Sequence, residues 1–101
     1  MIFVVLLEDE PSLGNEVRQR HMSEHLDFLE LNATAIKAAG PLRDAGDAPA
    51  GGLWLVEAES SGQVERLVRE DPFWPTGLRR SVQLLVWHQV FADGIRLGAS
   101  A

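Results

Sequence analysis

The chain has 101 residues and a formal net charge of −6, from 15 acidic and nine basic residues, and it contains no cysteine. That length fits one hydrophobic core, so we expect a single domain at residues 1–91 and a tail at residues 92–101. The acidic balance argues against nucleic acid as a partner, and the lack of cysteine excludes disulfides and thiolate chemistry.

The chain begins with an apolar run at residues 2–7 that is rich in β-branched side chains and predicts a buried strand. This run lacks the basic segment and cleavage site of a signal peptide, and no stretch approaches the roughly 20 apolar residues of a membrane span. We therefore predict a cytoplasmic protein without membrane contact. Residues 12–31 predict a long helix, because Met22, Leu26 and Leu29 recur at helical spacing.

The middle of the chain alternates between strand-like and breaker-rich segments. Residues 35–39 predict a second strand, which the pair Gly40 and Pro41 ends. Residues 42–52 are dominated by Ala, Asp, Gly and Pro, a composition typical of a mobile loop. Residues 53–58 are again apolar and predict a third strand.

A second helix is predicted to begin at Ser60, because Gln63 three residues later completes a capping box. It must end near Asp71, since Pro72 disfavours a helical residue before it. Residues 81–91 have the apolar density of a fourth strand.

The resulting order, β-α-β-β-α-β, is the split βαβ motif, an α+β fold with two helices on one face of a four-stranded antiparallel sheet. The first and last strands carry large apolar side chains on both faces, whereas a sheet covered on one side should alternate apolar and polar residues. We therefore expect a second copy to cover the open face in a two-fold symmetric, barrel-like homodimer. The sequence leaves open whether such dimers assemble further.

Two titratable residues stand out as a candidate site. His25 lies on the apolar stripe of the first helix, where it is either a core imidazole bonded to backbone or a general base, since imidazole titrates nearest to neutral pH. Asp71 precedes Pro72, where an Asx turn is its structural interpretation. With both helices on one sheet face, Asp71 can approach His25, fix its tautomer and make the other ring nitrogen a better base.

A zinc site is a minor alternative. His21, Glu24 and His25 match the pattern H-x-x-E-H, in which two helical imidazoles bind zinc beside a glutamate base. Hydrolases of that class need a further downstream carboxylate and a far larger body. We therefore expect no metal and no other cofactor, and we interpret His21 as a surface residue.

Aromatic and basic residues complete the candidate set. Phe73 and Trp74 form a loop directly after Asp71, and Trp74 fits either the wall of a pocket for a flat ligand or an apolar plug at a dimer seam. Most arginines are interpreted as solvated charges, but one near the pocket would bind an anionic substrate. The candidates are Arg18, Arg20, Arg79 and Arg80. We take Arg18, Arg20, Phe73 and Trp74 as the substrate-binding residues.

Four segments, in their order and spacing, resemble the YCII-related (YciI-like) family. They are the opening strand at 1–7, His25-Leu26, Ala38-Ala39-Gly40-Pro41-Leu42 and Glu70-Asp71-Pro72-Phe73. The likeness runs from Met1 to about Phe91. It implies a ferredoxin-like fold assembled as a dimeric α+β barrel, and no cofactor.

The resemblance also implies that His25 and Asp71 correspond to the family's histidine and aspartate, which face a cleft and are regarded as a catalytic dyad. A dehydrochlorinase acting on chlorinated hydroxyquinols is an activity in that family. Members often carry an arginine three residues before the histidine, where this chain has Met22.

Two functional hypotheses follow. The first is a small cofactor-independent enzyme that uses His25 for acid/base chemistry, oriented by Asp71, on a small aromatic or enolisable molecule. The alternative is a non-catalytic dimer that binds a metabolite or a protein, in which His25 and Asp71 form only a structural hydrogen bond.

Overall fold

The computed structural model describes residues 1–98. Residues 99–101, the end of the predicted tail, lie outside the described residues. The main elements are β1 (Ile2–Asp9), α1 (Gly14–Leu31), β2 (Ile36–Arg43), β3 (Pro49–Glu57), α2 (Ser61–Glu70), the 3-10 turn η1 (Trp74–Thr76) and β4 (Arg79–Trp87). A short hairpin, β5 (Phe91–Ala92) and β6 (Ile95–Arg96), follows. Neither α-helix is long and apolar enough to cross a membrane.

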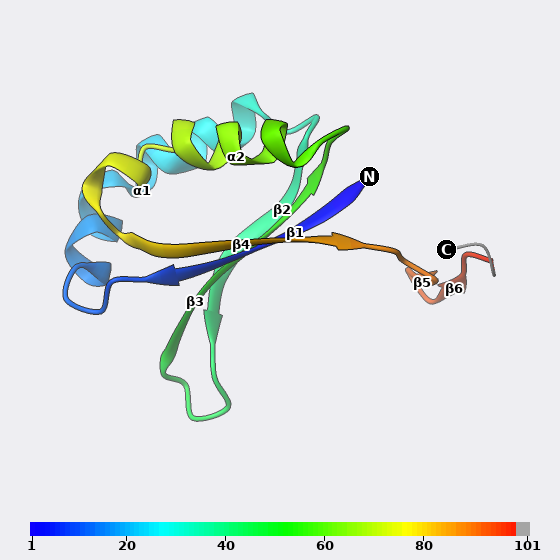
Figure 1. Cartoon of the computed structure of the whole chain (residues 1–101). Coiled ribbons are helices and arrows are strands. Elements are labelled where there is room, and N and C mark those ends of the chain that lie inside the picture. The colour runs from blue at the N-terminus through cyan, green and yellow to red at the C-terminus, as the bar shows by residue number, and fades with distance from the viewer. Residues whose placement is uncertain (99–101) are drawn as a thin grey trace.

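The four long strands form one antiparallel sheet in the order β2-β3-β1-β4. Figure 1 shows α1 and α2 side by side on one face of this sheet. The predicted α+β fold of the ferredoxin-like type, with βαββαβ order and both helices on one face, is therefore confirmed.

The core lies between the sheet and the helices. Alternate residues of β1 point into it, and they are directly opposite alternate residues of β3 and β4 in the strand register. α2 contributes two wholly buried valines one turn apart. The buried set is Phe3, Val5, Leu7, Ile36, Trp54, Val56, Val64 and Val68.

The opposite face of the sheet is also apolar. Val4 lies between Leu55 of β3 and Leu85 of β4, and Leu6 lies beside Leu53, so apolar side chains run across three strands. Both helices occupy the other side, which leaves Leu85 43% exposed. The two-sided apolar pattern expected from the sequence is present, and water would contact one side of it in a lone chain.

Two hairpins extend from the body. The β2–β3 hairpin extends away from the helices, and β5–β6 lies beyond the end of β4 (Figure 1). The radius of gyration is 14.5 Å, larger than the roughly 13 Å of a compact domain of about 100 residues. The two projecting hairpins account for the larger radius of gyration.

The prediction of a mobile loop at residues 42–52 is wrong. β2 continues to Arg43 and β3 begins at Pro49, so the connection is only five residues long, at 44–48. Strand pairing overrides the low strand propensity of this segment, and Asp44 closes the turn by accepting hydrogen bonds from the backbone N–H groups of Gly46 and Ala48.

The fourth strand is shorter than predicted. It begins at Arg79 and ends at Trp87, not at Phe91. Trp87 lies opposite Ile2, the first residue of β1, so the ladder ends where its partner strand begins. The apolar residues after Trp87 form the separate hairpin instead.

The buried face of α1 also differs from the predicted stripe. Leu26 is 49% exposed, whereas Val17 and His25 are buried. The face toward the sheet is therefore centred on His25.

The capping box of α2 is present in modified form, because Gln63 N–H donates to Ser60 Oγ while Gln63 Oε1 accepts from Glu59 N–H.

Gly51 offers a test of how β3 packs against β1. A Cβ at Gly51 would lie 2.0 Å from the carbonyl oxygen of Leu7, and its φ is +90°. Gly77 has a similar φ of +81° but only an ordinary contact with Leu13. We expect Gly77→Ala to cost about 1–2 kcal/mol of unfolding free energy from backbone strain alone, and Gly51→Ala to cost clearly more.

Urea unfolding at one fixed protein concentration measures both variants. Equal losses would show that β3 relaxes away from β1 without penalty, contrary to the packing described.

Candidate active site

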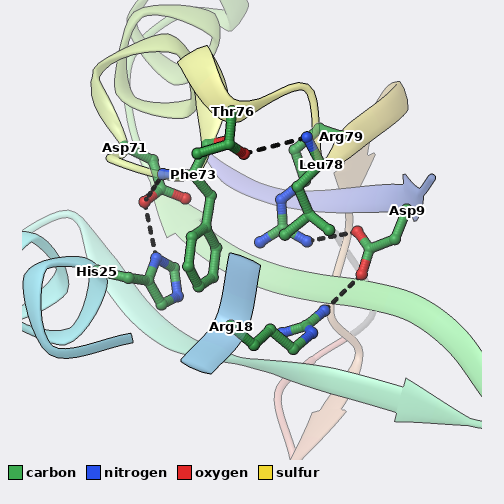
Figure 2. Close-up of polar contacts among 8 residues, drawn as sticks. All are labelled: Asp9, Arg18, His25, Asp71, Phe73, Thr76, Leu78 and Arg79. Atoms are coloured by element: carbon green, nitrogen blue, oxygen red, sulfur yellow. Dashed lines mark hydrogen bonds and ion pairs between the residues drawn. The ribbon is translucent and has the colours of Figure 1, made fainter. Parts of the chain in front are cut away.

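His25 and Asp71 meet in the interior. His25 comes from the middle of α1 and Asp71 from the end of α2, and their side chains are 9% and 2% exposed. The distance from His25 Nδ1 to Asp71 Oδ1 is 2.7 Å (Figure 2). A carboxylate only accepts hydrogen bonds, so Nδ1 carries the proton and donates it, and Nε2 is left with its lone pair.

Local chain geometry explains why Asp71 is in this position. Pro72 prevents α2 from continuing, and Asp71 adopts an extended backbone with ψ of 133°. Its Oδ1 also accepts the Phe73 N–H at 3.2 Å, and its carbonyl accepts the Trp74 N–H at 2.8 Å. The Asx turn and the contact with His25 therefore occur together, on the same carboxylate oxygen.

Phe73 fixes the plane of the imidazole. Its ring stacks on His25 with centroids 4.1 Å apart and an angle of 14° between the planes. Phe73 is wholly buried, and the Trp54 ring lies 6.4 Å from His25 on another side. The imidazole is thus held by a hydrogen bond and by aromatic packing, with little freedom to rotate.

A second charged cluster adjoins this pair. Asp9, at the end of β1, receives a hydrogen bond on each carboxylate oxygen: Arg18 Nη2 donates to Oδ2 and Arg79 Nη1 donates to Oδ1, the latter at 2.7 Å. Figure 2 shows Phe73 between His25 and Arg79. The guanidinium carbons of Arg18 and Arg79 lie 5.8 and 5.3 Å from the centre of the Phe73 ring.

A cavity of about 90 Å³ lies beside both clusters. Its charged or titratable lining comes from Arg18, His25 and Arg79, and the remaining wall is apolar or glycine, including Trp54. A larger cavity of about 530 Å³ shares Arg18 in its lining and is also lined by residues of the β2–β3 hairpin. The small cavity presents a titratable imidazole and cationic groups to an otherwise apolar space.

Several predicted site residues lie elsewhere. Arg20 is on the exposed side of α1, where it donates to Glu16 Oε1 at 3.3 Å, and it lines neither cavity. Trp74 is 37% exposed and also lines neither cavity. Phe73 also lines neither cavity and instead stacks on the His25 ring. Only Arg18 of the four predicted substrate-binding residues lines the cavities.

Arg79 corrects a sequence-based interpretation. The arginines were mostly interpreted as solvated charges, with Arg79 among four candidates for contact with an anion, and the Arg79 side chain is only 4% exposed and lines the small cavity. Asp9 was not predicted at all. The signal for both would have been an acidic residue ending the first strand opposite a basic residue beginning the fourth, because antiparallel pairing brings these ends together.

The zinc pattern does not assemble into a site. His21 Nδ1 lies 3.8 Å from Glu24 Oε2, while His25 turns inward to Asp71. Within residues 1–98, no group of three or more His, Cys, Asp or Glu side chains is arranged to hold a metal ion.

The tautomer of His25 is open to direct measurement. In nitrogen-correlated NMR spectra at alkaline pH, we expect His25 to carry its proton on Nδ1, because Asp71 accepts it there. The exposed His88 is the internal control and should show the distribution of free imidazole. Asp71→Asn should shift His25 toward that distribution. A proton on Nε2 of His25 in the unmodified protein would contradict the described hydrogen bond.

Comparisons with known proteins agree with this architecture. The family model of the YCII-related domain matches residues 1–88. A similar solved structure is the 5-chloro-2-hydroxyhydroquinone dehydrochlorinase (TftG) from Burkholderia phenoliruptrix AC1100, in complex with 2,5-dihydroxybenzoquinone. It is 30% identical, with a TM-score of 0.75 over 87% of this chain and 94% of that chain. No curated protein matches the chain.

Proposed function

The chain belongs to the YCII-related family, and from that premise we propose that it is a small enzyme that moves a proton on a small organic molecule. His25 is the general acid/base and Asp71 orients it. The observation that carries this proposal is a buried imidazole whose Nδ1 is held by a carboxylate at 2.7 Å while the same residue lines a cavity.

The geometry supports a definite division of roles. Nε2 of His25 has the free lone pair and accepts a proton from the substrate. The imidazolium that forms is stabilised by the carboxylate of Asp71, which stays ionised. Phe73 stacks on the ring and keeps its plane fixed during the transfer. In an isomerisation the proton then returns to the product from the same nitrogen, and in an elimination it is released to solvent.

The reaction class rests on the cavity and on the similar structure. The apolar walls, including Met22, Leu29 and Trp54, suit a flat aromatic or enolisable molecule. The similar dehydrochlorinase is named for a chlorinated hydroxyhydroquinone. We therefore propose proton transfer or elimination on a small compound of this kind. The cytoplasmic location and the absence of a cofactor stay predictions.

We also propose that the chain acts as a homodimer, with a second copy packed sheet against sheet on the apolar face. Val4, Leu55 and Leu85 form the centre of that face. The projecting β5–β6 hairpin carries Phe91 and Ile95, which are 61% and 63% exposed and have the apolar character of contact residues. Sedimentation also measures whether such dimers assemble into a larger complex.

The catalytic proposal predicts that replacing the His25 imidazole greatly lowers the reaction rate. Chloride release from 5-chloro-2-hydroxyhydroquinone and deuterium exchange from solvent into enolisable compounds are the two assays. We expect His25→Gln to lower the rate at least about a hundredfold, the usual contribution of one general acid/base. The control is His21→Gln, which removes a second imidazole of the same helix outside the cavity linings.

A native circular dichroism spectrum with an unchanged rate in His25→Gln would remove the catalytic role. Ligand binding without turnover in every variant would favour the alternative, a non-catalytic binding module.

The dimer proposal predicts that one charge on the open face separates the subunits. We expect Leu85→Glu to sediment as a monomer, because the substitution buries a carboxylate against Val4 and Leu55 in the interface. Leu31→Glu is the matched control, since Leu31 is 85% exposed at the end of α1. A wild-type chain that sediments as a monomer at micromolar concentration would overturn the proposal.

A further inference from the structure

Arg79 is a buried cation with too few partners. Its side chain is 4% exposed, and a guanidinium has five N–H donors. Within the described part of the chain, Arg79 donates a hydrogen bond from Nη1 to Asp9 Oδ1, and its Nε is buried without any partner. Buried polar groups are nearly always satisfied, so an incompletely paired guanidinium beside a cavity calls for an acceptor that the protein itself does not supply.

The charges around Arg79 do not balance. Asp9 is a single carboxylate shared by two guanidinium groups, which leaves the cluster with one excess positive charge. The buried carboxylate of Asp71 accepts hydrogen bonds on Oδ1 from His25 and from the Phe73 N–H. Phe73 separates it from Arg79 (Figure 2). In a chain with a net charge of −6, this is a local positive site.

The small cavity has the matching chemistry. Among residues 1–98, no carboxylate lines it, whereas Arg18 and Arg79 do, together with His25. The carboxylates of Glu8, Asp9 and Glu10 line the larger cavity instead. An anionic group therefore meets attraction in the small cavity and repulsion in part of the larger one. Little water surrounds the buried Arg79, so this attraction is screened less than at the surface.

The floor of the cavity leaves room beside the guanidinium. Gly52 of β3 lies under Arg79, and a Cβ there would be 3.5 Å from Arg79 Nη1. Any larger side chain would occupy the space next to the guanidinium. The volume of about 90 Å³ admits a small group rather than a large molecule, and Arg18 and Pro41 connect it with the larger cavity.

We propose that Arg79, assisted by Arg18, binds an anionic oxygen of the substrate, so that the substrate is a small carboxylate or an ionised enol or phenol. Asp9 is a positioning residue that holds both guanidinium groups against Phe73. The body of the substrate points toward the larger cavity. This inference rests on the proposed function only for the part that His25 plays.

The proposal gives Arg79 a role in the reaction as well as in binding. When His25 takes a proton from the carbon attached to the carbonyl carbon of the bound group, the C–H bond breaks, its electron pair forms a C=C bond, and the C=O pair moves onto the oxygen. Arg79 then stabilises the negative charge that develops. Return of the proton to another carbon completes an isomerisation. In an elimination the C–halogen bond breaks, the halide leaves with that bonding pair, and His25 releases its proton to solvent.

The binding test uses pairs of ligands that share a ring and differ in charge. 2,5-Dihydroxybenzoquinone is compared with 2,5-dimethoxybenzoquinone, and benzoate with benzamide, by calorimetry. The first pair probes an ionised enol and the second a carboxylate. We expect each anion to bind at least about tenfold more tightly than its neutral partner, because hydrogen bonds to a charged group contribute about 1.5–3 kcal/mol.

Arg79→Met should abolish the difference between charged and neutral ligands. Arg66→Met is the control, because Arg66 is an exposed arginine of α2. If Arg79→Met does not fold, Arg79→Lys decides, since lysine keeps the charge beside Asp9 but loses the planar fork and should weaken anion binding about tenfold. Unchanged anion preference in the folded variant would overturn the proposal.

His25→Gln separates this proposal from the catalytic one. It should keep the preference for anions while the rate falls. A normal rate in His25→Gln combined with lost anion binding in Arg79→Met would refute the catalytic role of His25 and leave the anion site standing. A wild type that binds both members of each pair equally would overturn the anion site whatever the rates.

Discussion

One carboxylate oxygen joins the two helices of this protein. Oδ1 of Asp71 accepts from His25 on α1 and from the backbone N–H of Phe73 just after α2. A buried carboxylate is expensive unless its hydrogen bonds are made, so the end of α2, the turn after it and the imidazole are fixed relative to one another. The tautomer of His25 and the stacking of Phe73 both follow from that arrangement.

Phe73 has a second effect, because it separates two charged clusters. On one side is the pair of His25 and Asp71, and on the other Arg79 is paired with Asp9 (Figure 2). Without the ring, Asp71 and Arg79 would be free to approach each other, and an ion pair between them would compete with the imidazole. The Phe73 ring thus keeps Asp71 paired with His25 and leaves Asp9 to pair with the guanidinium groups.

The sequence predicted most of the fold, because apolar periodicity and breakers report local structure directly. It also predicted that Asp71 could approach His25, since both helices must lie on one sheet face. It failed at residues 42–52, where cross-strand pairing overrode a loop-like composition. It did not single out Arg79 among the four candidate arginines, because the burial of a charge depends on a partner such as Asp9, 70 residues away along the chain.

The alternation of β1 sets a limit on how this chain can vary. Phe3, Val5 and Leu7 pack under the helices, while Val4 and Leu6 face the other way. Inserting or deleting one residue there would exchange the two sets and turn the core outward. Replacement of one apolar residue by another preserves both surfaces. Changes of length are therefore expected outside the paired strands, for example at the tip at 44–48.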